Sequence, residues 1–156
     1  MDPLHEFMNN ISPLSEDSFN IYMDLCDSKT YKAGTILTEI GTIPEHLYFI
    51  KEGVSRSYSI NKKGTEYIRS HISNNNILAA TEALITKTPS KVACQCLTDC
   101  KLLEINYEDL MAKCKENPEI SAWYMKTLEL HYAHVLKTND ELLTLIQAEL
   151  RRSGYE

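Results

Sequence analysis

Two hydrophobic periods divide the chain into a strand-forming part and a helical part. Between Tyr31 and about Ile105 apolar residues recur at every second position, as at Tyr48 and Ile50, which is typical of strands with one buried face. Glycines interrupt these runs where a short strand has to turn, because glycine adopts positive φ at no steric cost. The pattern predicts a compact antiparallel barrel of the jelly-roll kind, with roughly eight strands.

Helical spacing precedes this barrel. Ser15 is followed by acidic residues, an arrangement typical of a helix N-terminus, and Phe19, Met23 and Cys26 then follow at helical spacing. We therefore expect a short amphipathic helix that packs on the barrel.

Helical spacing also follows the barrel, first in residues 107–114 and then in a long stretch that opens with Asn117-Pro118. Asparagine at the cap and proline at the first helical position form a strong start signal. We expect two units: the N-terminal helix and barrel in residues 1–116, and a long helix with its C-terminal end in residues 117–156.

The long helix carries two apolar lines, and no glycine or proline interrupts residues 119–152. Leu128, Val135 and Leu142 repeat every seven residues, and a second line lies beside them. The members of the second line are Tyr132, Leu136, Leu143 and Leu150. A stripe this wide exceeds what one barrel covers, so the pattern predicts a homodimer seam at Leu128, Val135 and Leu142. The alternative is a helix that lies wholly on its own barrel.

Composition narrows the function further. A chain of 156 residues with 43% apolar residues is long enough for one core, but too short to add a full DNA-binding domain. The net charge of −6 disfavours contact with phosphodiester backbones. No apolar run approaches the roughly 20 residues of a membrane helix, and Met1-Asp-Pro-Leu-His-Glu6 does not start like a secretory signal. We expect a cytoplasmic protein with no membrane partner.

Four short segments around the glycines of the barrel resemble those of a known protein family. They are Tyr31-Lys-Ala-Gly34, Ile40-Gly41, Leu47-Tyr-Phe-Ile-Lys-Glu-Gly53 and Asn61-Lys-Lys-Gly64-Thr-Glu66. From about Ile11 to about Leu150 the chain resembles the cyclic-nucleotide-binding sensor domain of Crp/Fnr-type transcription regulators. The resemblance implies a mainly β fold with flanking helices, in which a jelly-roll (double-stranded β-helix) barrel is followed by a long C-terminal dimerisation helix.

The resemblance also locates a ligand pocket and shows that it is altered. In the family a Gly-Glu pair and an Arg about ten residues later hold the cyclic phosphate; the matching positions here are Ala79, Ala80 and Ser90. Glu82 lies two residues late and Lys91 one residue late, where a strand points its side chain to the opposite face. Lysine also lacks the bidentate geometry of arginine. We therefore expect no binding of cAMP or cGMP in the family's usual manner.

The side of the pocket that would face the base is altered as well. Two hydroxyl residues of the long helix reach the base in cAMP-binding members, and the matching positions are Val135 and Leu136, both apolar. The pocket is either filled by its own side chains or accepts a less polar ligand. The candidate pocket residues are Ala79, Ala80, Thr81, Glu82, Ser90, Lys91, Val135 and Leu136.

The sequence supports neither a metal site nor catalysis. Cys94, Cys96 and Cys100 have no histidine at ligand spacing, so we interpret them as buried reduced thiols, in keeping with an odd total of five cysteines. His131 and His134 share a helix face, a pair more often solvated or at a dimer seam than metal-bound. No catalytic constellation is recognisable, and no cofactor is expected.

The resemblance implies the sensor and dimerisation part of a transcription regulator, with a degenerate phosphate cassette and an effector of unknown identity. It implies DNA contact only through a helix-turn-helix domain beyond the long helix, which the chain has either lost or been cut before. Two alternatives stay open: a stand-alone dimeric protein-interaction module, and a cyclic-nucleotide receptor with a pocket rearranged around Lys91, Thr81 and Glu82.

Overall fold

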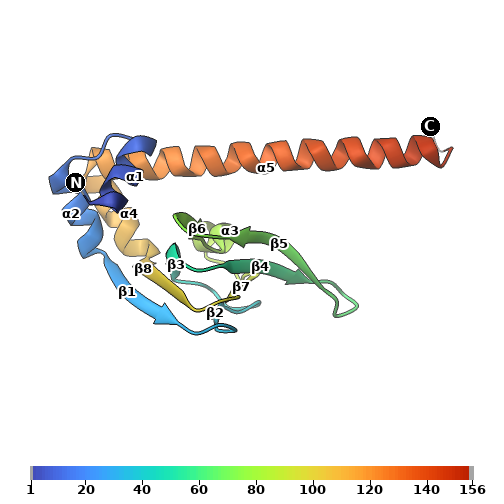
Figure 1. Cartoon of the computed structure of the whole chain (residues 1–156), viewed down its shortest axis with the longest axis horizontal. Helices are drawn as coiled ribbons and strands as arrows, with labels where there is room; N and C mark the ends of the chain where they lie inside the picture. Colours follow the sequence, from blue (N-terminus) through green and yellow to red (C-terminus); the bar gives the residue numbers. More distant parts are fainter. Residues whose placement is uncertain (1, 155–156) are drawn as a thin grey trace.

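The computed structural model describes residues 2–154, which form two four-stranded antiparallel sheets with helices at one end (Figure 1). One sheet has the order β1-β8-β3-β6 and the other β2-β7-β4-β5. The strands are β1 (Cys26–Tyr31), β2 (Ile36–Thr38), β3 (His46–Glu52), β4 (Ser55–Ile60), β5 (Glu66–Ile72), β6 (Asn76–Leu78), β7 (Ala93–Cys96) and β8 (Cys100–Asn106). The predicted eight-stranded jelly roll is confirmed.

Two strands carry little periodic signal. β1 is an edge strand paired with β8, and its burial pattern is mostly exposed, so its sequence does not alternate in polarity. β6 has only three residues and pairs with β3 at the edge of the same sheet. Both strands are fixed by partners distant in sequence, which a local pattern does not report.

Two helices precede the barrel, where the sequence predicted one. The predicted helix is α2 (Glu16–Asp24), and the Ser15 hydroxyl caps it by accepting the N–H of Ser18 at 3.2 Å. The additional helix is α1 (Pro3–Ile11), capped by the Asp2 carboxylate, which accepts the N–H of Leu4 at 2.7 Å. An acidic cap followed by proline is a helix start, so the signal for α1 was present in the sequence.

The core has two parts. Between the two sheets, the buried side chains include Ile50, Leu102 and three cysteines, Cys94, Cys96 and Cys100. Under the helices, a second cluster joins α1, α2, the barrel and the last two helices, α4 (Tyr107–Glu116) and α5 (Pro118–Arg152). The helices are therefore anchored to one end of the barrel by their own apolar side chains.

Gly53 shows how tightly the barrel closes. Its φ is +125°, and a Cβ at this position would lie 2.7 Å from both the Asp99 carbonyl oxygen and the Cys100 Sγ. The turn after β3 therefore requires glycine both for its backbone conformation and for the lack of space beside β8.

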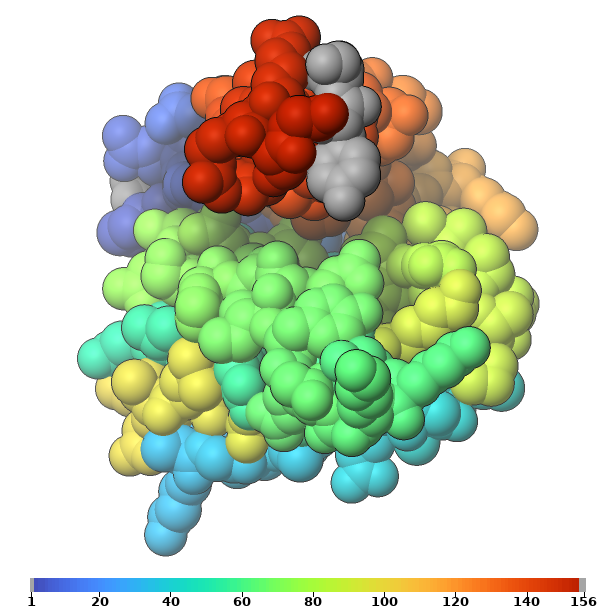
Figure 2. Space-filling model, turned by 90° about the vertical axis from the view of Figure 1, so that its right-hand side faces the viewer, coloured from blue at the N-terminus to red at the C-terminus, as the bar shows by residue number. Residues whose placement is uncertain are grey.

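The long helix α5 begins as predicted and then leaves the core. The Asn117 side chain caps it by accepting the N–H of Ile120 at 3.1 Å, with Pro118 in the first turn. Its only buried residues are Ile120 and Trp123, among the 35 residues of a helix about 52 Å long. Figure 1 shows α5 running from the N-terminal helices along one side of the barrel, and Figure 2 shows its far end lying over the barrel. No helix of the described residues is long and apolar enough to cross a membrane.

Candidate functional site

A pocket of about 380 Å³ lies between the barrel and the middle of α5. This volume falls within the range of roughly 300–1,000 Å³ that small-molecule sites occupy. The pocket walls come from β4 and β5, the short helix α3 (Thr81–Thr86) with the turns on either side of it, and α5. The lining residues are Ser57, Arg69, Ser70, Ala79, Ala80, Thr81, Glu82, Ala83, Thr88, Pro89, Ser90, Lys91, Val92, His131, His134, Val135, Thr138 and Asn139.

The structure brings together the residues that the sequence selected. Of the candidate pocket residues, all but Leu136 line this one cavity. Leu136 is exposed and lies one position beyond Val135, which on a helix turns the side chain by about 100°. The two neighbours therefore face different surroundings: Val135 faces the pocket, and Leu136 lies outside its wall.

Alanine and serine stand at the three positions that the resemblance matches to a phosphate cassette, Ala79, Ala80 and Ser90. Ala80 is buried and precedes α3 without any side-chain cap. Ser90, also buried, donates its hydroxyl to the Val92 carbonyl at 2.6 Å and accepts the Val92 N–H at 3.2 Å. Its hydrogen-bonding capacity is thus taken up by its own turn. An alanine methyl and an engaged hydroxyl supply neither a carboxylate nor a guanidinium.

The two charged side chains near the cassette pair with each other. Lys91 Nζ lies 3.6 Å from a Glu82 carboxylate oxygen, and both side chains are largely exposed at the rim of the pocket. The backbone carbonyl of Lys91 accepts the Ser59 hydroxyl at 3.1 Å, which fixes the strand entry beneath. Ser90 is buried and Lys91 is exposed, but both line the pocket and both precede β7, so the strand alternation that the sequence predicted between them is not observed.

The sequence reading did not place several polar lining residues in the pocket. Ser57 and Ser70 face each other across β4 and β5, with their hydroxyl oxygens 2.5 Å apart. Arg69 lines the same wall, and His131 and His134 come from α5. The histidines were visible as a pair at i, i+3, but only the path of α5 over the barrel shows that this face meets β5. Nothing local marks Arg69.

Three of the five cysteines lie in the barrel interior. Cys94, Cys96 and Cys100 are free thiols with no solvent exposure, as the sequence predicted. Burial raises the pKa of Cys94 to about 11 and that of Cys96 to about 12, the latter with a further contribution from Cys100. Thiols held in the neutral form are poor nucleophiles and poor metal ligands. Within residues 2–154 no three His, Cys, Asp or Glu side chains are grouped to hold a metal ion.

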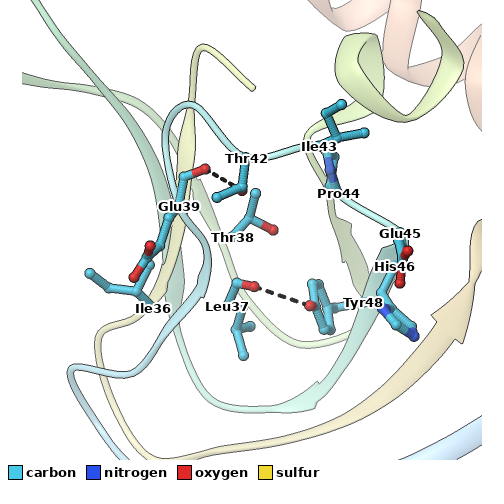
Figure 3. Close-up of a pocket in the computed structure, with 10 residues that line it drawn as sticks. All are labelled: Ile36, Leu37, Thr38, Glu39, Thr42, Ile43, Pro44, Glu45, His46 and Tyr48. Carbon is cyan, nitrogen blue, oxygen red and sulfur yellow. Dashed lines mark hydrogen bonds between the residues drawn. The ribbon is translucent and has the colours of Figure 1, made fainter. Parts of the chain in front are cut away.

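A second hollow of about 370 Å³ lies on the loop between β2 and β3 (Figure 3). The Tyr48 hydroxyl donates to the Leu37 carbonyl at 3.3 Å there, and the Thr42 hydroxyl donates to the Glu39 carbonyl at 2.7 Å. This hollow includes no residue of the predicted pocket and has no lysine or arginine in its wall. Its wall is formed by β2, by the start of β3 and by the loop that joins them.

The sequence matches one protein family. Residues 28–117, more than half of the chain, match the profile described as the cyclic nucleotide-binding domain. No curated protein matches the chain significantly.

Solved structures share the whole architecture at low sequence identity. The catabolite activator protein of Thermus thermophilus matches with a TM-score of 0.73 at 17% identity, covering 95% of this chain and 72% of that protein. The N-terminal domain of a transcriptional regulator from Streptomyces coelicolor A3(2) matches with a TM-score of 0.64 at 20% identity, covering 90% of this chain and 95% of that domain. Oxidized CprK in complex with o-chlorophenolacetic acid matches with a TM-score of 0.63 at 13% identity, covering 82% of this chain and 53% of that protein. These likenesses concern the fold, including the long helix beyond the barrel.

Proposed function

This chain belongs to the cyclic nucleotide-binding domain family, and on that premise we propose that it is the effector-sensing and dimerisation part of a Crp/Fnr-like transcription regulator. The observation that supports this proposal most is a pair of neighbours on α5. Val135 lines the pocket, and Leu136 belongs to an exposed apolar line that has no cover within the described chain. A molecule in the pocket therefore touches the same turn of helix that a second copy would cover.

The dimer seam follows from the spacing of exposed residues. From Tyr132 onwards the spacing alternates between four and three residues, which is the heptad pattern of a coiled coil. The members are Tyr132, Leu136, Asn139, Leu143, Ile146 and Leu150. The apolar members are 43–64% exposed in the single chain. We place the centre of the seam on this line, with the predicted Leu128, Val135 and Leu142 flanking it on the barrel side.

The proposed mechanism is a bias between two ways of packing two α5 helices. Asn139 lines the pocket and also occupies a heptad position, where a polar side chain specifies register at a cost in stability. An effector that contacts Asn139 and Val135 would change which packing is favoured. The altered crossing would then change the spacing of whatever is joined beyond α5.

The effector we propose is not cAMP or cGMP bound in the family's manner. Ala79, Ala80 and Ser90 occupy the matching phosphate positions, and Val135 and Leu136 occupy those near the base. Calorimetry with cAMP and cGMP up to millimolar concentration should show no saturable heat. A dissociation constant at or below about 10 µM, equivalent to roughly −7 kcal/mol, would contradict this part of the proposal. Lys91→Ala would then show whether Lys91 holds the phosphate.

The described residues should not read DNA by themselves. The net charge is −6, and no helix-turn-helix follows α5 within residues 2–154. A mobility-shift assay with the protein's own promoter region at about 150 mM salt should give no discrete complex at micromolar protein. A complex that survives competitor DNA would refute the view of this segment as sensor and dimer domain only.

The position of the seam can be tested by cross-linking. Leu143→Cys should form a disulfide between two copies on mild oxidation, because equivalent heptad positions approach each other in a parallel pair. Leu145→Cys is the matched control: it is more exposed, at 67% against 58%, but lies about 160° away around the helix. Equal cross-linking of the two variants would remove the seam from the Leu143 line.

A further inference from the structure

Arg69 stands at an irregularity of β5. Ser57 of β4 is opposite Ser70 of β5, but the next residue, Tyr58, is opposite Ile68, so Arg69 is the extra residue of a β-bulge. In a regular strand two consecutive side chains point to opposite faces. Here both Arg69 and Ser70 line the pocket, because the bulge breaks that alternation. Bulges commonly re-aim a side chain in this way beside functional sites.

Arg69 also differs from the other arginines in its partners. Arg56 pairs with Glu66 at 3.1 Å and lies over the Tyr58 ring at 4.2 Å, and Arg152 pairs with Glu149. Arg151 is engaged as well. Within residues 2–154 the side chain of Arg69 makes no hydrogen bond, ion pair or ring contact, although its guanidinium has five N–H donors. The strand therefore presents an unused cation to the pocket.

The other walls of the pocket supply hydrogen-bond donors and almost no negative charge. His131 and His134 enter from α5, together with the amide of Asn139. Among the described residues that line the wall, the sole carboxylate belongs to Glu82, and it pairs with Lys91 at the rim. A positive wall of this kind is a local feature, because the chain as a whole carries a net charge of −6.

We propose that the effector is a small molecule with an oxyanion, a phosphate ester or a carboxylate, which Arg69 binds through its guanidinium fork. This inference rests on the proposed function, since it names the ligand class of the same pocket. His131, His134 and Asn139 donate to the oxyanion or to its hydroxyl neighbours from α5, so the ligand links β5 to the seam helix. The anion is held from the β5 side rather than from the turn at Ala79 and Ala80, where the family holds its phosphate.

The volume and the solvent exposure of the site determine how tightly we expect an anion to bind. A cavity of about 380 Å³ admits a metabolite-sized molecule rather than a lone ion. Arg69 is exposed in the single chain, so water and salt weaken its attraction to a simple oxyanion. Inorganic phosphate alone should therefore bind at millimolar concentration, and an organic anion that fills the cavity should bind more tightly.

The test is a titration followed by nitrogen-15 NMR, with the Arg69 Nε–H signal as the reporter. The probes are inorganic phosphate, glucose 6-phosphate, citrate and phenylacetate at constant ionic strength, with sodium chloride as reference. The first two probes carry a phosphate group and the last two carry carboxylates, so comparing them shows which of the two anionic groups the site prefers. At least one probe should give saturable shifts at Arg69, His131 and His134, with a dissociation constant at or below about 10 mM.

Three variants locate the anion site. Arg69→Gln should weaken the best probe at least about tenfold, since hydrogen bonds to a charged group contribute about that much. Arg69→Lys keeps the positive charge but lacks the two-pronged guanidinium, so its affinity for the probe should lie between those of the wild type and of Arg69→Gln. Lys32→Gln removes another exposed positive charge, directly after β1 of the other sheet and outside the pocket wall, and should leave binding unchanged. Within residues 2–154 the Arg69 side chain makes no hydrogen bond or ion pair, so its replacement should leave the melting temperature unchanged.

Two results would overturn the proposal: no saturable shift at Arg69 with any probe, or binding that Arg69→Gln leaves unchanged. Either result leaves the dimer seam untouched, because the cross-linking of Leu143→Cys reports on the seam without any ligand. Conversely, anion binding in a monomeric protein would support the anion site and refute the proposed dimer. Arg69-dependent binding of cAMP would support the anion site and contradict the exclusion of cyclic nucleotides.

Discussion

The two ends of α5 have the same helical geometry and opposite surroundings. Near its start, Ile120 and Trp123 are 0% and 2% exposed, packed among α1, α2 and α4. From residue 131 to residue 154 every residue is exposed, including Tyr132 at 64% and Leu143 at 58%. The first end is covered by its own chain, whereas the second presents an apolar line with heptad spacing to solvent. A long uncovered apolar line of this kind marks an interaction surface.

Hydrogen bonds sharpen the contrast. The Trp123 indole N–H donates to the Met8 carbonyl at 3.1 Å, and the Tyr22 ring packs edge-on against Trp123 at 5.3 Å. Glu119 accepts the Ser15 N–H at 2.7 Å, and this contact lowers the pKa of its carboxylate. Farther along, the side-chain hydrogen bonds of α5 run within the helix itself, as from Thr138 to the His134 carbonyl. The first end is thus a docking segment and the second a projecting arm.

Trp123→Ala should have the largest effect on stability. Removing a buried aromatic ring and its indole hydrogen bond costs about 3–5 kcal/mol of unfolding free energy. Urea denaturation followed by circular dichroism measures the loss. Leu145→Ala on the projecting arm is the control and should change stability by less than about 0.5 kcal/mol. Equal losses in the two variants would erase the contrast between the two ends.

The second-largest expected effect is a loss of folding stability at alkaline pH, caused by the buried thiols of the barrel interior. The pKa of Cys94 rises from 9.0 to about 11 and that of Cys96 from 9.0 to about 12, mainly because burial disfavours the thiolate. The unfolded chain loses these protons first, so stability is complete below pH 9 and declines between pH 9 and about 11–12. For Cys94 this decline amounts to about 3 kcal/mol, at about 1.4 kcal/mol for each pH unit between 9 and 11.

Urea midpoints measured from pH 8 to pH 11 test the decline. Replacement of Cys94 and Cys96 by alanine should lower stability at pH 8, because buried volume is lost, and flatten the dependence above pH 9. An unchanged slope in the double variant would show that other groups cause the alkaline loss.

Asn139→Leu should have a smaller effect, confined to the projecting arm. A polar side chain at a heptad core position specifies register at a cost, so leucine should strengthen self-association by about 1 kcal/mol and loosen its specificity. Sedimentation velocity over a concentration series measures the association constant. Weaker association in this variant would place Asn139 outside the seam.

Much of the fold was readable from the sequence, because its signals are local. The cap at Asn117 and the turn at Gly64 each depend on neighbouring residues, and the structure shows both. The alternation predicted at Tyr48 and Ile50 was wrong for β3, because this strand is buried on both faces and its residues 47–50 are all buried. β1 was missed because its polar residues form a strand only through pairing with β8. The helix α1 was missed although Asp2 and Pro3 signalled it.

The candidate site was readable only in part. Matching to the family selected Ala79 and Ser90, and the structure places both in the wall of one pocket. Arg69 was not recognisable, because its place depends on a bulge set by the register of two strands. The division of α5 into a pocket-facing side and an outer side also required the structure, since Val135 and Leu136 are both apolar and adjacent in sequence.

Sedimentation equilibrium tests the central claim, that the projecting arm of α5 is a seam between two copies, most directly. The wild-type chain should sediment at twice its 17.9 kDa mass at micromolar concentration. Leu136→Glu with Leu143→Glu should yield folded monomers, because charges buried against their symmetry copies carry a large desolvation cost. Leu130→Glu with Leu145→Glu changes two equally exposed leucines on other faces and should remain dimeric. A wild-type monomer at about 100 µM, a concentration at which even weak specific dimers form, would contradict the account; so would a dimer that the first pair of substitutions leaves intact.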